Sequence, residues 1–417
     1  MPAKSKSAEI ERQLEVIRSG IEELIPEAEL VRKLERSLAS GKPLRVKQGF
    51  DPTAPDIHLG HTIGLRKLRQ FQDLGHQVVL IVGSYTALVG DPSGRSQTRP
   101  TLSEEEVHAN AQTYLDQFFK VVDKAKTEVR WNGEWFKAMS FVDVLKLTSR
   151  FTVARILERD DFDIRFKKGE PISVHELLYP LMQAYDSVVI RADIEIGATE
   201  QKFNLLTGRD IQAAYDVEPQ VILTLPVLEG LDGVRRMSKS LGNYIGIAEP
   251  PKEIYGKVMS LPDKLIERYF RLVTDATPEE CSEVAKSLRD GANPMALKKA
   301  LAHRIVRMYH GKTAADFAQE EFEKQFSRRE LPSDLPTVEL EPGAIRARDL
   351  VMRAFPNQYT GNSAGNLFKQ GAVYIGGERV TDAAKEIRVG GGVGGAQGEV
   401  IIKIGRKIAR VVPKGGR

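Results

Sequence analysis

The sequence predicts an α/β fold in which a parallel sheet is followed by a helical segment and a small α+β module. First, a strand, a helix and a second strand follow one another between residues 44 and 83, which is the pattern of a βαβ unit. Second, strand character disappears between residues 252 and 330, where apolar residues recur at helical spacing. Third, residues 343–417 read as short strands and helices around a glycine-rich loop.

Apolar periodicity and turn residues place the elements. We expect helices at 8–40, 61–74, 104–121, 141–157, 174–185, 201–206, 295–310 and 314–326. We expect strands at 44–50, 77–83, 188–196 and 221–225. Pro332, Pro336 and Pro342 predict a linker at 331–342. Because parallel sheets bind ligands beyond the carboxyl ends of their strands, we expect the functional site at that edge.

Composition limits the class of protein. A chain of 417 residues has room for two or three domains, and 41% apolar with 28% charged residues is ordinary for a globular protein. The single cysteine, Cys281, excludes a disulfide within the chain and fits a reducing compartment. No stretch is apolar for the length of a membrane span, and the basic start at 1–7 lacks the apolar segment of a secretory signal. We therefore expect a cytoplasmic protein.

The net charge of +4 is unevenly distributed. From Ala344 to Arg417 there are 13 basic and 5 acidic residues, a balance of +8, which leaves a balance of −4 for the rest of the chain. A basic module on a mildly acidic body indicates a polyanionic partner. A solvated basic face is the alternative that charge alone leaves open.

His58-Leu59-Gly60-His61 places two imidazoles three residues apart at the start of a predicted helix. Imidazole donors at a helix N-terminus can bind phosphate oxygens as negative charge develops, and Gly60 lets a nucleotide approach the backbone. Two surface histidines, or half of a metal site, are the alternatives. A metal is the weaker one, because Cys281 is distant in sequence and no third ligand has suitable spacing. We expect no structural metal.

A second motif, Arg236-Met237-Ser238-Lys239-Ser240, follows Gly230, Asp232 and Gly233. Two cations three residues apart in a glycine-flanked loop can wrap a pyrophosphate, and the hydroxyls add donors. An exposed basic loop is the alternative reading of this motif alone. Together and in this order, the two motifs describe a protein that cleaves ATP between its α- and β-phosphates.

Two further patterns carry polar groups. Asp91-Pro-Ser-Gly-Arg95, with Arg99, is similar to a phosphate-cradling turn but lacks the Gly-Lys-Ser/Thr end of a P-loop, which disfavours an ordinary kinase or GTPase. Tyr179, Gln183 and Asp186 share one face of an otherwise apolar helix. A ligand with an amine and a hydroxyl could satisfy them, and a solvent-exposed helix face is the alternative.

From Leu44 to the C-terminus the chain resembles the bacterial type of tyrosyl-tRNA synthetase, a class I family with HIGH and KMSKS motifs. His58–His61 is the HIGH-type motif, Arg236–Ser240 is the KMSKS-type motif, and Gly49–Thr53 looks like the strand and turn before the first motif. Residues 346–389 look like an S4-type RNA-binding domain. The resemblance implies four segments: a Rossmann-like catalytic domain with an N-terminal helix and a connective insertion at 1–244, a helical anticodon-side domain at 245–330, the linker at 331–342, and the S4-like domain at 343–417.

The resemblance also implies a reaction and the residues that perform it. L-Tyrosine would attack Mg-ATP to give tyrosyl-adenylate and pyrophosphate, and the tyrosyl group would then pass to the 3′ end of tRNA(Tyr) in a homodimer. The implied catalytic residues are His58, His61, Arg236 and Lys239. The implied ATP contacts are Gly49, Asp51, Thr53, His58, Gly60, His61, Arg95, Arg99, Gly197, Ala198, Glu200, Met237, Ser238, Lys239 and Ser240. The implied tyrosine contacts are Lys47, Gly49, Asp91, Tyr179, Gln183, Asp186 and Gln201. The implied RNA contacts are Arg346, Arg348, Lys369 and Arg379.

Three features depart from the family pattern. Ala198 and Glu200 stand where the family usually has Gly and Asp, Lys47 stands where some members have a second phenol-binding Tyr, and Arg236 replaces the usual first Lys of its motif. A small-molecule adenylate-forming ligase and an inactive RNA-binding protein are the alternative classes. Tryptophan is the nearest rival substrate, and the acid at Asp186 favours a phenol.

Overall fold

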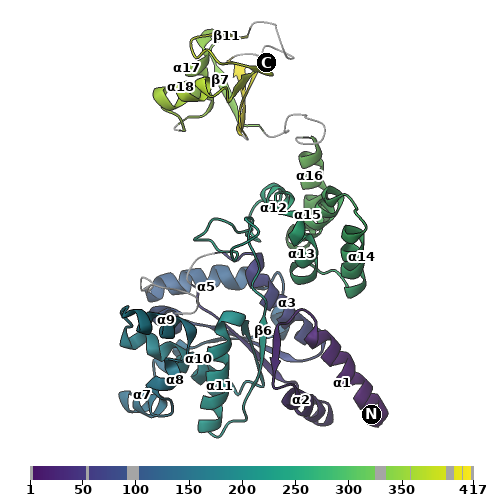
Figure 1. Cartoon of the computed structure of the whole chain (residues 1–417), viewed down its shortest axis with the longest axis vertical. Coiled ribbons are helices and arrows are strands. Elements are labelled where there is room, and N and C mark those ends of the chain that lie inside the picture. Colours follow the sequence, from purple (N-terminus) through teal and green to yellow (C-terminus); the bar gives the residue numbers. More distant parts are fainter. Residues whose placement is uncertain are drawn as a thin grey trace. The chain divides into compact units, whose positions relative to one another are not determined.

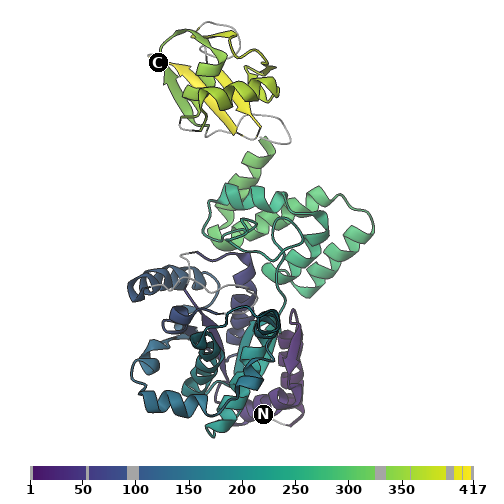
Figure 2. The same cartoon turned by 60° about the vertical axis from the view of Figure 1, so that its left-hand side comes forward.

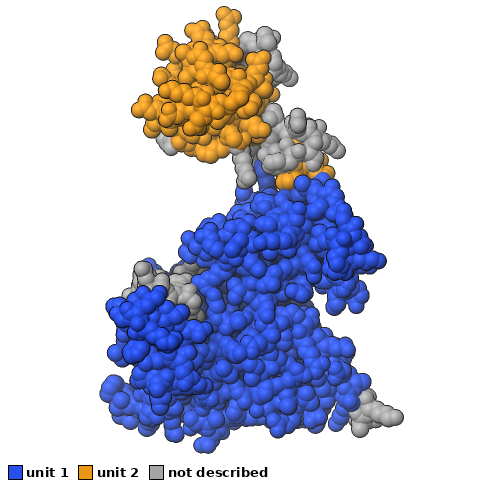
Figure 3. All heavy atoms as spheres, viewed as in Figure 1, with its two compact units in different colours: residues 1–319 blue, residues 320–417 orange. Residues whose placement is uncertain are grey.

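The computed structural model describes residues 3–52, 56–91, 103–324, 335–356, 358–390, 399–405 and 407–414. The chain forms two compact units, residues 1–319 and residues 320–417, which Figure 3 shows in different colours. Thr53, Arg95 and Arg99, three of the predicted ATP contacts, lie outside the described residues.

A six-stranded sheet forms the centre of the first unit, in the order β1-β6-β5-β2-β3-β4. The strands are β1 (Glu23–Ile25), β2 (Arg45–Phe50), β3 (Gln77–Val82), β4 (Thr127–Trp131), β5 (Ile194–Ala198) and β6 (Val221–Leu225). Every neighbouring pair is parallel except β1 with β6. The chain leaves β2 toward β3 on one side, and β5 lies on the other, so the topological switch point, where α/β sheets bind ligands, lies between β2 and β5. The predicted α/β class is confirmed.

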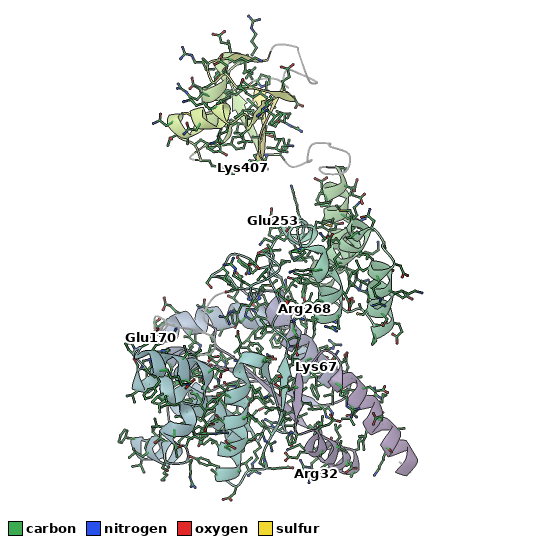
Figure 4. The ribbon with its side chains drawn as sticks, in the orientation of Figure 1. Arg32, Lys67, Glu170, Glu253, Arg268 and Lys407 are labelled. Atoms are coloured by element: carbon green, nitrogen blue, oxygen red, sulfur yellow. The ribbon has the colours of Figure 1, made fainter. Side chains whose placement is uncertain are left out.

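Helices cover both faces of this sheet (Figure 1). They are α1 (Ala3–Arg18), α2 (Glu27–Ser40), α3 (Leu59–Asp73), α4 (Thr86–Val89), α5 (Glu104–Phe118), α6 (Gly133–Phe136), α7 (Phe141–Thr148), α8 (Val153–Ile156), α9 (Asp160–Lys168), α10 (Tyr179–Ile190) and α11 (Lys202–Ala214), with 3₁₀ turns at Lys124–Lys126, Val174–Leu178 and Thr199–Gln201. Helix α3 packs against β2, β3 and β5, and α11 packs against β5 and β6. The buried Lys67 of α3 (Figure 4) donates to the carbonyls of Val16, Ile17 and Ser19, which satisfies the end of α1.

A helical layer follows the sheet in sequence, visible in green in Figure 2. It contains α12 (Pro251–Met259), α13 (Ile266–Val273), α14 (Pro278–Arg289), α15 (Pro294–His310) and α16 (Lys312–Phe322), with a 3₁₀ turn at Asp263–Leu265. Helices α12 and α13 pack on α15, and α13 also packs on α14 and α3. The prediction of a helical segment after the sheet is confirmed. In the parts of the chain that the structure describes, no helix is both long and apolar enough to cross a membrane.

Several predicted elements were wrong. The single helix at 8–40 is interrupted by β1, because Gly20 adopts a positive φ of 71° and Pro26 precedes α2. The expected strand at 188–196 begins only at Ile194, since residues 188–190 complete α10 and Arg191 ends it in the left-handed conformation. The helix expected at 141–157 is two helices, α7 and α8, capped separately by Ser140 and Thr152. Strand β4 and helix α9 were not predicted.

The second unit is a small α+β structure. Its elements are β7 (Thr337–Leu340), β8 (Gly343–Arg346), α17 (Ala347–Ala354), α18 (Gly361–Lys369), β9 (Val373–Ile375), β10 (Glu378–Arg379), β11 (Glu386–Val389), β12 (Val400–Ile404) and β13 (Lys407–Pro413). The sheets run β10-β9-β12-β13-β7 and β11-β8. Leu350 and Phe368, from the two helices, are buried with Ile402 in one apolar core. Part of the expected linker at 331–342 is strand β7, which pairs in parallel with β13.

Candidate active site

A cavity of about 330 Å³ lies beside the carboxyl ends of β2 and β5, and both sequence motifs line it. Its wall includes many of the predicted site residues: Gly49, Asp51, His58, Gly60, His61, Asp91, Tyr179, Ala198, Glu200, Gln201, Arg236, Met237 and Ser238. Gln48, Gly64, Tyr114 and Leu228 also line it and were not predicted. The fold therefore brings predicted residues from six separate stretches of the sequence to one place, at the edge where parallel sheets bind ligands.

The two histidines form the N-terminal cap of α3, which begins at Leu59 rather than at the predicted His61. His58 Nδ1 accepts from the Gly60 amide at 3.2 Å, and His61 Nδ1 accepts from the His58 amide at 3.2 Å. Their rings stack with centroids 3.8 Å apart. Because each Nδ1 is an acceptor, a neutral ring carries its proton on Nε2, where it can be donated to a ligand.

The charge state of these rings follows from burial. Burial lowers the pKa of His61 to about 4, with a further contribution from the cation of Lys239. Burial lowers the pKa of His58 even further, helped by the charges of His61 and Lys239. Both imidazoles are therefore neutral N–H donors at pH 7. They can bind a phosphate oxygen without adding positive charge.

The Arg236–Ser240 loop is anchored at its base. Met237 is buried, and its amide donates to the Leu228 carbonyl at 2.7 Å. From α13, Arg268 (Figure 4) donates to the Val227 carbonyl at 3.0 Å, and Tyr269 donates to the Glu229 carbonyl at 2.6 Å. The backbone leading into the loop is thus fixed by the sheet side and the helical layer together.

The cations of this loop reach toward the first motif and toward β5. Lys239 Nζ donates to the backbone carbonyl of Asp56, and it lies outside the cavity lining. Arg236 forms a 2.7 Å ion pair with Glu200, and each side chain is about one third exposed. The two residues of this pair are both departures from the family pattern. Ser238 and Ser240 share a hydroxyl hydrogen bond of 2.9 Å.

The polar face of α10 is buried: Tyr179, Gln183 and Asp186 are at most 9% exposed, so the solvent-exposed alternative is wrong. Tyr179 Oη donates to Asp51 at 2.8 Å, in the cavity wall. Gln183 accepts from Asn204 at 2.9 Å and lies behind that wall.

Asp91 is held in place by hydrogen bonds from two elements. Gln201 Nε2 donates to Asp91 Oδ2 at 3.3 Å, and the buried Arg159 donates to Oδ1 at 3.4 Å. Arg159 also bonds Asp161 at 2.7 Å and Asn204 at 3.1 Å. Sequence reasoning missed Arg159 and Asn204, because neither belongs to a motif and only the fold brings them to Asp91.

Asp186 lies in a dry setting. Trp135 Nε1 donates to its carboxyl at 3.0 Å and Asn132 Nδ2 at 3.4 Å. Burial raises the pKa of Asp186 to about 7, against the lowering effect of Lys47 and of these two donors. Trp135 and Asn132 were also missed, because they follow the unpredicted strand β4.

Lys47 lies in the core instead of the cavity wall. It is fully buried on β2, beside Glu195 of β5 in the parallel register, and the two form a 2.9 Å ion pair. Its Nζ also donates to the Gln183 carbonyl and to Ser187 Oγ, both at 2.8 Å. Every N–H of this ammonium therefore has a partner within the core. Gly197, also on β5, does not line the cavity either.

The predicted RNA contacts all lie in the second unit. Arg346 precedes α17, Arg348 lies in its first turn, Lys369 ends α18, and Arg379 is on β10. Arg346, Lys369 and Arg379 are exposed and Arg348 is half-buried. Arg379 is fixed by a 2.8 Å hydrogen bond from Nε to the Gly371 carbonyl.

Comparison with known proteins identifies the family. Residues 39–327 match the family described as tRNA synthetases class I (W and Y). The chain belongs to this family. The tyrosine–tRNA ligase of Moorella thermoacetica is 50% identical over 404 residues, covering 97% of this chain and 96% of the relative. That of Carboxydothermus hydrogenoformans is 52% identical over 379 residues, covering 90% and 92%. The predicted bacterial-type tyrosyl-tRNA synthetase, an aminoacyl-tRNA ligase, is confirmed.

Solved structures agree on the fold. Tyrosyl-tRNA synthetase from Archaeoglobus fulgidus, complexed with L-tyrosine, has a TM-score of 0.61 at 24% identity and covers 74% of this chain and 99% of that chain. A C-terminally truncated mitochondrial tyrosyl-tRNA synthetase from Aspergillus nidulans has a TM-score of 0.63 at 21% identity, with 78% and 99% covered. The synthetase fold thus persists at low identity.

The raised pKa of Asp186 predicts a pH dependence of stability. Between its ordinary pKa of 3.8 and about 7, the folded protein keeps a proton that the unfolded chain has lost. The free energy of unfolding therefore falls as pH rises through this window, by up to about 1.4 kcal/mol per pH unit. Asn does not titrate, so Asp186→Asn removes this pH dependence. The difference in free energy of unfolding between variant and wild type should shift in favour of the variant as pH rises to about 7, and should stay constant above that pH. Urea denaturation at several pH values measures this, and a pH-independent difference would contradict it.

Proposed function

We propose that the cavity is where the chain activates L-tyrosine with ATP, giving tyrosyl-adenylate and pyrophosphate, before the tyrosyl group passes to the 3′ end of tRNA(Tyr). The observation that carries this proposal is the meeting of the two motifs at one cavity: His58 and His61 line it together with Arg236, while Lys239 bonds the neighbouring Asp56 carbonyl. We propose that Mg²⁺ enters with ATP, as part of that substrate.

The chemistry requires positioning and charge stabilisation more than a protein nucleophile. The tyrosine carboxylate attacks the α-phosphorus, and the bond to the β-phosphate oxygen breaks. His58 and His61 would donate Nε2–H to oxygens that gain negative charge, and Arg236 and Lys239 would hold the departing pyrophosphate. Glu200, the acid of the adjoining turn, would accept from the ribose, together with the backbone of Ala198.

We place the tyrosine pocket at the wall formed by Asp91, Tyr179 and Gln201, with Gln183 and Asp186 behind the residues that line the cavity. Asp91, Tyr179 and Gln201 would surround the amino group, since Asp91 is a carboxylate held in position by Gln201. Asp186 would accept the phenol hydroxyl, because it is a buried acid on the same helix as Tyr179 and its two donors fix its orientation. Gln183 would support the pocket through its contact with Asn204.

We propose that the chain works as a homodimer. Large apolar side chains are exposed within one stretch that includes α7, α8 and α9: Phe141, Val142, Leu145, Val153, Ile164, Phe166 and Val174. Phe141 is 76% exposed and Phe166 is 64% exposed, which favours a covered surface in the assembled protein. Analytical ultracentrifugation of the whole chain decides between monomer and dimer.

We place the activity in the cytoplasm, since it consumes ATP and tRNA and the single cysteine suits a reducing compartment.

Lys239→Ala tests the role of the loop. Because the cation would act on the leaving pyrophosphate, adenylate formation should slow by about 2–4 kcal/mol in activation free energy, while tyrosine affinity stays nearly unchanged. Single-turnover adenylate formation and equilibrium tyrosine binding measure the two effects. Lys312→Ala, which removes an exposed lysine on α16, is the matched control. An unchanged rate in Lys239→Ala would rule out the proposed role.

Asp186→Asn tests specificity. The substitution keeps the shape of the side chain but weakens the acceptor for the phenol, so tyrosine loses more binding than phenylalanine. The ratio of kcat/KM for the two amino acids in ATP–pyrophosphate exchange should fall sharply. If that ratio stays at the wild-type value, the hydroxyl is held elsewhere.

A chain ending at Lys324 separates activation from tRNA recognition. It retains the first unit and both motifs, so tyrosine-dependent pyrophosphate exchange should persist. It loses the basic second unit, so tRNA charging should fall, and the intact protein's tRNA affinity should decrease steeply with salt while its tyrosine affinity does not. Equal tRNA charging by the truncated and intact chains would show that the second unit does not bind tRNA.

A further inference from the structure

Asn243, three residues beyond the Arg236–Ser240 loop, is buried at 5% exposure and binds that loop at several points. Its Oδ1 accepts from the Ser238 amide at 2.9 Å, and its Nδ2 donates to the Arg236 carbonyl at 3.0 Å. Nδ2 also donates to the Asp232 carboxylate at 2.9 Å. The two backbone contacts flank Met237, so the amide fixes the segment that carries both loop cations.

Only an amide of this length supplies these contacts. The position needs one acceptor and two donors within a single short side chain, which Asp and Ser lack. Gly230 makes room for the Asn243 amide by having no side chain, because a Cβ on Gly230 would lie 2.4 Å from Asn243 Cγ and Nδ2. Asn243 also accepts from the Leu231 amide through its own carbonyl, at 2.9 Å. The segment before the loop is therefore attached to Asn243 at Leu231 and Asp232.

The backbone that follows Asn243 pairs with the first motif. The Leu59 amide donates to the Ile245 carbonyl at 3.0 Å, and the Ile247 amide donates to the Ile57 carbonyl at 3.2 Å. His58 and Gly246 form the bridge between these two bonds. Asn243 thus holds the second motif with its side chain, while the chain immediately after it holds the first.

We propose that Asn243 is a positioning residue for tyrosine activation: its amide sets the backbone of the Arg236–Ser240 loop so that Arg236 and Lys239 reach the pyrophosphate in register with His58 and His61. This inference rests on the roles proposed above for those two cations. Asn243 itself acts through the loop and does not line the cavity.

The first experiment separates positioning from stability. Asn243→Ala should slow single-turnover adenylate formation about 10- to 100-fold, as expected when a hydrogen-bonded buried group loses its partners. Tyrosine Kd should stay close to that of the wild type. The lost hydrogen bonds should lower the melting temperature, so the rate is expressed per folded active site. An unchanged rate per site overturns the proposal. So does a rate that falls only in proportion to tyrosine affinity.

The second experiment exchanges the two partners at the 2.9 Å contact between Nδ2 and Asp232. Asn243→Asp alone places two carboxylates together and removes the donor, so it should be at least as slow as Asn243→Ala. Adding Asp232→Asn restores a donor–acceptor pair and should recover part of the lost rate. No recovery in the double variant, with both proteins folded, overturns the role of this contact.

A double-mutant cycle distinguishes the proposed role of Asn243 from the proposed roles of Arg236 and Lys239. If Asn243 acts through Lys239, Asn243→Ala should slow adenylate formation less in the Lys239→Ala variant than in the wild type. If the two substitutions slow the reaction independently, so that their effects on the activation free energy add in full, the inference is overturned. If Arg236→Ala and Lys239→Ala are both as fast as the wild type, the proposed roles of the cations fall, and this inference falls with them. If those variants are slow and Asn243→Ala is fast, only the inference about Asn243 fails.

Discussion

The site depends on a short backbone pairing between residues 57–59 and 245–247. Its two hydrogen bonds, at 3.0 and 3.2 Å, join the start of α3 to the segment that leaves the second motif. Lys239 contacts the carbonyl of Asp56, which lies 183 positions earlier in the chain. The sheet alone does not fix this neighbourhood, because β2 and β6 are separated by β5. The pairing, with the anchors from α13, brings the loop beside the histidines, so that Arg236 lines the same cavity and Lys239 reaches the Asp56 carbonyl.

His58 and His61 both cap helix α3 and present neutral N–H donors to the cavity. Each closes the N-terminus of α3 through Nδ1, which satisfies amides that would otherwise lack partners. That bond directs the ring proton to Nε2, and desolvation keeps both rings neutral at pH 7. A charged imidazole beside Lys239 would repel it. The helix cap therefore prepares two donors that are compatible with nearby cations.

The predictions from sequence were most accurate where the residues of a short segment determine its structure by themselves. Strand β6 was placed at its exact bounds, and the two motifs were found because their residue types are unusual at such short spacing. The failures came where tertiary contacts decide. Residues 188–190 have strand-like composition, yet α10 continues through them because Val188 packs against a cluster with Leu181 and Ile211. The polar partners behind the cavity, such as Arg159 and Trp135, belong to no motif. Their role appears only when the sheet brings distant segments together.

Lys47 belongs to the core and not to the cavity wall. In this chain the strand register sets it beside Glu195, and the pair is fully buried with Gln183 and Ser187 as further partners. A buried charge without its partner is costly, so Lys47 and Glu195 are constrained together. The departures at Glu200 and Arg236 are also coupled, since they form one ion pair. That pair is one third exposed and contributes only about 0–1 kcal/mol, so it orients the loop without locking it. The buried Lys47–Glu195 pair is therefore a constraint on the core. The exposed Arg236–Glu200 pair leaves both charges free to exchange partners when a nucleotide binds.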